Sequence, residues 1–287
     1  MKQFADWVTR RAYRAGLVAA ALALVPPLGI VGSGVLVLTS LRRGPGLGWA
    51  AAAMATLVLL LAAVAGGADP LSAVFAGLVF WAPAVGMAEV LRKSGSLDLC
   101  VQIAVIVGLL LTAMWLTAAG GAWTKTLADE VRPLLEGSGF EPEAIAAVLI
   151  LVPGVMAMSL VLAALSGLFL GMYWQAALTS PGALGTAFRR LRVGRLLAVI
   201  GLVVLVGGLV TGHAAFANLL LILAIGFMLQ GLAIVHGLAA HRGWPPGALI
   251  LVYVLLVFGM SLMAPLLAVF GLADNWLDLR SRFPGRA

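Results

Sequence analysis

Chemistry in this chain would have to come from the few polar side chains that lie within its long apolar stretches. Glu89 is the only acid well inside such a stretch, and Asn218, Gln230 and His236 mark a single later one. An ionisable group inside a bilayer costs at least about 2.5–3.5 kcal/mol, so these residues are candidates for ligand binding or proton transfer. The competing interpretations are an interfacial ion pair for Glu89, with the basic residues three and four positions later, and helix-to-helix hydrogen bonds for the other three.

The motifs of intramembrane catalysis are missing from the sequence. Ser33 and Ser166 each precede a glycine, but neither has the earlier glycine of the Gly-x-Ser-Gly motif that a rhomboid-like serine protease needs. The three histidines have no ligand-like spacing, and no Walker lysine follows a glycine-rich loop. We therefore expect no enzymatic activity, no metal, no cofactor and no energy source within the chain.

The composition indicates a membrane protein. Hydrophobic residues make up 63% of the chain and charged residues only 10%, whereas soluble domains carry about a quarter charged residues. Apolar blocks such as 49–65 and 219–235 are long enough to cross a hydrocarbon core of roughly 30 Å as helices. A net charge of +7 comes from short basic clusters between these blocks, which indicates membrane topology and not nucleic-acid binding. We predict an all-α, polytopic helical bundle.

The topology depends on how the break at Pro26 and Pro27 is interpreted, as one kinked span or as a hairpin of two short ones. With the hairpin and a cytoplasmic N-terminus, thirteen of the eighteen basic residues fall on one side, which the positive-inside rule favours. About eight or nine transmembrane segments result, and the side of the C-terminus stays open because Pro265 could split the last one. The nine-segment version is 15–25, 28–41, 47–66, 71–91, 98–118, 143–173, 196–211, 216–238 and 247–272.

Two amphipathic helices are expected outside the spans. Phe4, Trp7 and Val8 recur at helical spacing beside a basic cluster, which predicts a short helix on the cytoplasmic surface. The loop 119–142 has apolar residues at helical spacing and five acidic residues, which predicts an external surface helix. This loop divides a single transmembrane domain, residues 1–287, into a first half, 15–118, and a second half, 143–275.

Three further patterns stand out. Ala15, Ala19 and Ala23 follow one another at i, i+4, which lets another helix approach closely. The turn Arg42-Arg43-Gly44-Pro45 and the string 271–280 are distinctive in the order of their residues. If neither pattern binds a partner protein, both are explained as structures at the membrane interface. The arginines would then contact lipid phosphates, and a tryptophan would lie in the aromatic belt. The string 271–280 contributes Asp274, Trp276, Asp278 and Arg280.

With these strings, the chain resembles the YybS-like family of bacterial multi-pass membrane proteins from about residue 15 to residue 283. The resemblance rests on the Leu-Arg-Arg-Gly-Pro turn after the proline pair, on Asn218 with the string 229–236, and on the closing string 271–280. The early region is also similar to the S components of energy-coupling-factor transporters, in which an alanine-lined first helix docks on a coupling subunit. That likeness implies an S-component-like core, with a membrane coupling subunit and an ATPase as partners. The chain departs from it by about three extra spans and by lacking a polar and aromatic cluster for a vitamin.

Two functions follow as hypotheses. The first is a non-catalytic, solute-binding or transport-related subunit of the bacterial cytoplasmic membrane, which docks on its partners through Ala15, Ala19 and Ala23. The second is a scaffold or regulatory protein without a small ligand, which holds lipid or protein through a basic loop formed by Arg189, Arg190, Arg192 and Arg195. A proton-coupled transporter is a third hypothesis, and it rests on Glu89 alone, whereas a proton relay across a membrane uses a chain of ionisable residues. The sequence does not specify the oligomeric state.

Overall fold

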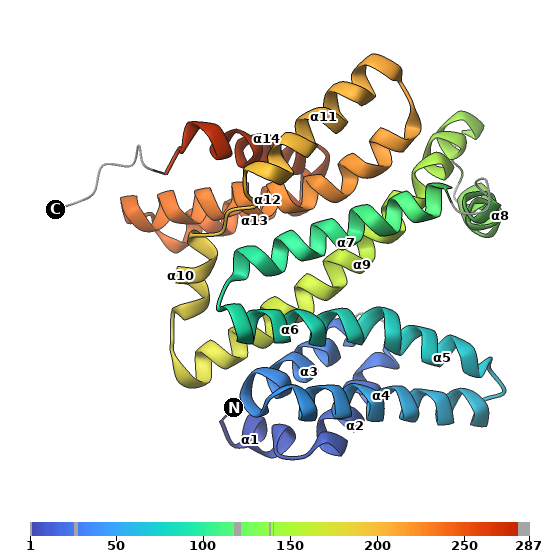
Figure 1. Cartoon of the computed structure of the whole chain (residues 1–287), viewed down its shortest axis with the longest axis vertical. Helices are drawn as coiled ribbons and strands as arrows, with labels where there is room; N and C mark the ends of the chain where they lie inside the picture. Colours follow the sequence, from blue (N-terminus) through green and yellow to red (C-terminus); the bar gives the residue numbers. More distant parts are fainter. Residues whose placement is uncertain (1, 26–27, 118–121, 138, 140, 281–287) are drawn as a thin grey trace. The chain divides into compact units, whose positions relative to one another are not determined.

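The computed structural model describes residues 2–25, 28–117, 122–137, 139 and 141–280, and all of the regular elements there are helices (Figure 1). Six of them are long and apolar enough to cross a membrane. The all-α class is thus confirmed, and six such helices agree with a multi-pass membrane protein. The six are Pro45–Ala65, Pro70–Ser94, Leu97–Thr117, Pro142–Thr179, Ala214–Arg242 and Met260–Leu277.

Three shorter apolar helices are Ala12–Ala23, Arg195–Thr211 and Gly247–Phe258. The first two match the predicted segments 15–25 and 196–211, whereas Gly247–Phe258 and Met260–Leu277 together cover the predicted segment 247–272. The predicted segment 28–41 is the helix Gly29–Arg43, which is not among these nine helices, so the count of eight or nine transmembrane segments stays a prediction. The proline pair at 26–27 lies outside the described residues. The helices on either side of it, Ala12–Ala23 and Gly29–Arg43, pack against each other within one unit. These residues therefore form a helical hairpin and not one kinked span.

The chain divides into two compact units, and the division differs from the halves that we predicted on either side of the loop 119–142. Unit 1 comprises residues 1–100 and 162–187, and unit 2 comprises residues 101–161 and 188–287. The reason lies in the 38-residue helix α9, Pro142–Thr179. Its later part packs on the helix Gly29–Arg43, where Gly34 faces Leu170 and Gly171 faces Val37. Helix α9 therefore belongs partly to each unit.

Unit 1 is built around the α2–α3 hairpin. Its helices are α1 (Lys2–Thr9), α2 (Ala12–Ala23), α3 (Gly29–Arg43), α4 (Pro45–Ala65), α5 (Pro70–Ala76), the π-helical turn η2 (Gly77–Trp81) and α6 (Ala82–Ser94), with α10 (Ala183–Arg189) near its end. Proline stands in the first turn of α4 and α5, where its missing N–H leaves no helical bond unmade. Pro83 lies instead within the continuous helical stretch Pro70–Ser94, two residues after η2, which agrees with a proline that disturbs the preceding turn.

The alanine face of α2 lies inside unit 1. Ala15 and Ala19 are fully buried, and Ala23 is partly buried against the same core. A Cβ on Gly32 of α3 would lie 2.8 Å from the carbonyl oxygen of Ala19, so the two backbones nearly touch. The predicted docking surface is therefore covered by the chain's own helices, because small side chains allow close approach to any neighbouring helix.

Unit 2 contains α8 (Ala122–Glu136), the early part of α9, α11 (Arg195–Thr211), α12 (Ala214–Arg242), α13 (Pro246–Phe258) and α14 (Met260–Leu277), as well as most of α7 (Leu97–Thr117). The closest crossing joins α12 to α14. A Cβ on Gly231 would collide with the carbonyl oxygen of Leu267, and one on Gly271 with that of Phe227. Backbone contact of this kind requires glycine on both helices.

The predicted helix in the loop 119–142 is present as α8. Its Val131 and Leu135 pack against a small core of Ile145, Leu149 and Val152 on α9. The last predicted segment is split, as anticipated, but at Gly259 between α13 and α14 and not at Pro265, which lies inside α14. Gly259 has φ −114° and ψ 33°, outside the helical range.

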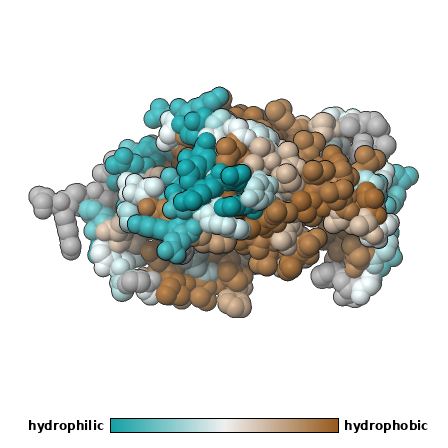
Figure 2. Space-filling view, turned by 90° about the horizontal axis from the view of Figure 1, so that it is seen from below, coloured by the Kyte–Doolittle hydropathy of each residue, from teal (hydrophilic) through white to brown (hydrophobic). Residues whose placement is uncertain are grey.

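The outer surface of the chain is strongly apolar. Figure 2 shows large areas of hydrophobic side chains beside hydrophilic patches on the face in view. Large apolar side chains are exposed along both the long and the shorter apolar helices, with Leu110 of α7 at 65%, Val203 of α11 at 64% and Phe258 of α13 at 86%. A soluble monomer rarely exposes apolar surface on this scale, so contact with lipid explains the surface.

Candidate functional site

Gln230 lies at the centre of a buried polar network in unit 2. Its side chain is completely buried on α12. Its Oε1 accepts the backbone N–H of Val193 at 2.8 Å, and its Nε2 donates to Oδ2 of Asp274 on α14 at 2.9 Å. The residue that we singled out as a ligand candidate therefore binds the chain itself, and both ends of its amide are occupied.

Asp274 and Arg280 join the closing string 271–280 to the same network. Asp274 is 1% exposed; its Oδ1 accepts the backbone N–H of Leu279 at 2.9 Å, and its Oδ2 lies 3.3 Å from Nε of Arg280. The Arg280 guanidinium also donates to the carbonyl oxygens of Arg189 at 2.8 Å and Leu191 at 2.6 Å. A buried carboxylate and a mostly buried guanidinium thus compensate each other, as groups of opposite charge must at low dielectric.

The basic loop between α10 and α11 is held by this network. Residues 191–194 are not helical. Arg192 forms an ion pair with Asp278 at 2.5 Å, and Nε of Arg195 donates to the carbonyl oxygen of Asn275 at 3.3 Å. Because this segment is not helical, some of its backbone groups need other partners: Gln230 of α12 binds the N–H of Val193, and Arg280 binds the carbonyl oxygen of Leu191. Arg190 is exposed beside it.

Asn218 has a separate structural role at a proline in α9. Pro153 lies within that helix. Oδ1 of Asn218 accepts the backbone N–H of Gly154 at 2.7 Å, and its Nδ2 donates to the carbonyl oxygen of Ile150 at 3.0 Å. Gly154 and Ile150 are the i, i−4 pair that an undisturbed helix would bond directly. The amide of Asn218 therefore bridges the turn that the proline disturbs.

His236 makes contacts with neighbouring segments and not with the network. Its Nδ1 lies 2.9 Å from the carbonyl oxygen of Leu232, and its Nε2 lies 3.1 Å from the hydroxyl of Tyr253 on α13. Since the carbonyl can only accept, Nδ1 donates to it, and Nε2 shares a hydrogen bond with the hydroxyl of Tyr253. Phe188 contacts the ring edge-on at 5.3 Å between centroids.

Glu89 lies in unit 1 and is paired there. Its Oε2 is 3.3 Å from the Arg92 guanidinium, and its Oε1 accepts the Ser40 hydroxyl at 2.6 Å. The ion pair expected with Arg92 is therefore present. Only 13% of the Glu89 side chain is exposed. Ser40 is the partner that sequence reasoning missed, since a residue 49 positions away gives no local signal.

The Arg-Arg-Gly-Pro turn separates α3 from α4. Gly44 has φ +93°, which few other residues adopt, and Pro45 begins the next helix. Arg43 is exposed, whereas Arg42 forms an ion pair with Asp6 of α1 at 2.6 Å. Arg42 thus holds the N-terminal helix, and the membrane-interface position of the two arginines stays a prediction. Trp276, predicted for an aromatic belt, is 45% exposed.

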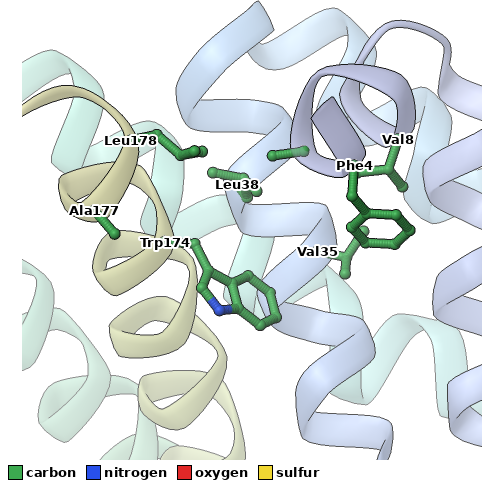
Figure 3. A pocket seen from close by; sticks show the side chains of 8 residues that line it. Phe4, Val8, Val35, Leu38, Trp174, Ala177 and Leu178 are labelled. Atoms are coloured by element: carbon green, nitrogen blue, oxygen red, sulfur yellow. The ribbon is translucent and has the colours of Figure 1, made fainter. Parts of the chain in front are cut away.

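Unit 1 also contains a cavity of about 390 Å³ between α1, α3 and the later part of α9 (Figure 3). All of the side chains that line it are apolar except for the indole nitrogen of Trp174. No sequence pattern predicted it, because three segments far apart in the chain form it. The lining residues are Phe4, Ala5, Val8, Val35, Leu38, Trp174, Ala177 and Leu178.

The arrangement offers packing and binding surfaces, but within the described ranges no three His, Cys, Asp or Glu side chains are grouped so as to hold a metal ion. Comparison of the chain with protein-family models, with curated proteins and with solved structures finds no match. The likeness to the YybS-like family and to S components therefore stays a prediction from the motifs.

Proposed function

We propose that the chain is a non-catalytic, multi-pass protein of the bacterial cytoplasmic membrane that works as a scaffold or regulator. The observation that carries this proposal is that the polar residues singled out as ligand candidates already have hydrogen-bond partners within the chain. Glu89, Asn218, Gln230 and His236 each bond to side chains or backbone of this chain. Since these groups stabilise the fold, they leave no polar pocket of their own for a small solute.

In this proposal the loop between α10 and α11 is the cytoplasmic binding surface. The hairpin of α2 and α3, together with the basic clusters, favours a cytoplasmic N-terminus and about nine segments, with the basic loop on the same side. The network of Gln230, Asp274 and Arg280 fixes the loop backbone, which leaves the exposed Arg190 to meet anionic lipid or an acidic protein surface.

The test is a gentle purification from native membranes with mass spectrometry of everything that stays bound. Arg190→Glu should lose the bound partners or anionic lipids while its thermal stability equals that of the wild type. Gln230→Leu should lower thermal stability, because it leaves the N–H of Val193 without its acceptor and removes one hydrogen-bond donor from the carboxylate of Asp274. Arg43→Glu, an exposed charge reversal in unit 1, is the matched control. Unchanged recovery with Arg190→Glu would contradict the proposal.

A solute-binding or transport-related subunit is the second candidate, and the apolar cavity of unit 1 favours it. A volume of about 390 Å³ falls within the range of ligand pockets, roughly 300–1,000 Å³. A coupling subunit and an ATPase would supply energy, but they would need a surface other than the buried face of Ala15 and Ala19. Recovery of an ATPase with a membrane subunit in the same purification would support this candidate over the scaffold.

A further inference from the structure

The cavity of unit 1 combines an apolar interior with a basic group beside it. Figure 3 shows Phe4 and Val8 of α1 facing Trp174 and Leu178 of α9 across the side chains of α3. A cavity with this lining gives a polar solute no hydrogen-bond partner except one indole N–H. Because burial of apolar surface is favourable and burial of unpaired polar groups is not, its interior suits a hydrocarbon chain.

Arg42 lies on the same face of α3, one turn beyond Leu38 of the cavity wall. Its Nη2 pairs with Asp6, which follows Ala5 of the wall, so the guanidinium reaches the α1 side of the cavity. Its Nη1 is buried and has no hydrogen-bond partner. A buried guanidinium N–H without an acceptor is costly, and a phosphate oxygen is among its best acceptors.

The charges around this group favour an anion. Asp6 forms the ion pair with Arg42 that the described residues show, and it neutralises a single positive charge. Lys2 stands four positions before Asp6 on α1, and Arg43 follows Arg42 directly. The surroundings therefore remain net positive beside an apolar cavity. An anionic phospholipid matches both features, because its phosphate suits the basic residues and its acyl chain suits the cavity.

We propose that the cavity binds one acyl chain of an anionic phospholipid, whose phosphate accepts a hydrogen bond from Nη1 of Arg42. The lipid fixes α1 against α3 and α9 and makes the N-terminal helix sensitive to the anionic lipid content of the membrane. This site lies in unit 1 and is independent of the basic loop in unit 2, so either proposal can fail without the other.

Native mass spectrometry of the purified full-length protein, titrated with phosphatidylglycerol or phosphatidylcholine of the same acyl chains, tests the site. We expect one phosphatidylglycerol to bind in preference to phosphatidylcholine. Arg42→Gln should weaken that binding by about tenfold, the worth of one hydrogen bond to a charged group. Arg43→Gln removes the same charge one residue away and should change affinity by less than about twofold. Equal losses in the two variants would overturn the proposal.

Two further variants separate lipid binding from folding. Asp6→Asn breaks the same ion pair as Arg42→Gln but leaves the guanidinium, so it should bind phosphatidylglycerol as tightly as the wild type or more tightly. Ala177→Trp places a large side chain in the cavity and should abolish binding, whereas Ala147→Trp, at an exposed position earlier in α9, should not. Loss of binding in Asp6→Asn, or wild-type binding in Ala177→Trp, would refute the site.

Discussion

The crossing of α12 and α14 makes Gly231→Ala the most informative single substitution. An added Cβ would lie 2.7 Å from the carbonyl carbon of Leu267 and closer still to its oxygen, whereas ordinary contacts begin at about 3.4 Å, so the helices must separate by at least about 0.7 Å. If the separation acts along the bond between Gln230, one residue away, and Asp274, that bond lengthens from 2.9 Å to about 3.6 Å or more, beyond hydrogen-bonding distance.

The expected cost of Gly231→Ala is roughly 2–4 kcal/mol, from overpacking of about 1–3 kcal/mol and one lost hydrogen bond of about 0.5–1.5 kcal/mol. The matched control is Gly237→Ala on the same helix, where an added Cβ meets nothing within 4 Å. There alanine should stabilise the helix by about 0.5–1 kcal/mol. Sodium dodecyl sulfate unfolding in mixed micelles, followed by circular dichroism, measures both. If the two variants have equal stability, the close crossing does not position the network.

Three other substitutions test the remaining contacts, each by the same unfolding measurement. Asn218→Leu should cost about 1–3 kcal/mol of unfolding free energy, because two backbone groups at the proline of α9 lose their partner. The control Ser159→Ala removes only a hydroxyl that is bonded within its own helical turn. It should cost less than about 0.5 kcal/mol. Similar values for the two would contradict the bridging role. Glu89→Gln should cost less than about 1 kcal/mol, because it weakens a partly exposed ion pair and keeps an acceptor for Ser40; a larger loss would mean that the charge is essential. Gly44→Ala should cost about 1–2 kcal/mol from its positive φ alone, since no atom lies near the added Cβ, and an unchanged stability would show that the turn can relax.

Much of the helical organisation could be predicted from the sequence, because apolar length and proline position act locally. The segment 98–118 appears as Leu97–Thr117, and the segment 47–66 as Pro45–Ala65. The Gly44-Pro45 turn could be predicted equally well. Glycine readily adopts the positive φ found at position 44, and proline is favoured in the first turn of the helix that follows.

The candidate residues were identifiable, but their partners were not. An intramembrane Gln230 is conspicuous by its cost in lipid, yet nothing local distinguishes a ligand-binding amide from one that bonds to Val193 and Asp274. Likewise, the spacing of Ala15 and Ala19 shows that a helix can approach, but it cannot show whether that helix belongs to a partner or, as here, to the chain itself.

The sequence by itself determined that this chain is a helical membrane protein with few polar groups, because hydrophobic length and charge distribution depend only on composition along the chain. Tertiary structure alone decided what those groups contact. It joined the closing string to the basic loop through Arg280, set Asn218 against the proline of α9, and formed an apolar cavity from α1, α3 and the later part of α9. Each of these contacts joins residues far apart in the chain, and such contacts follow from helix packing and not from any local pattern.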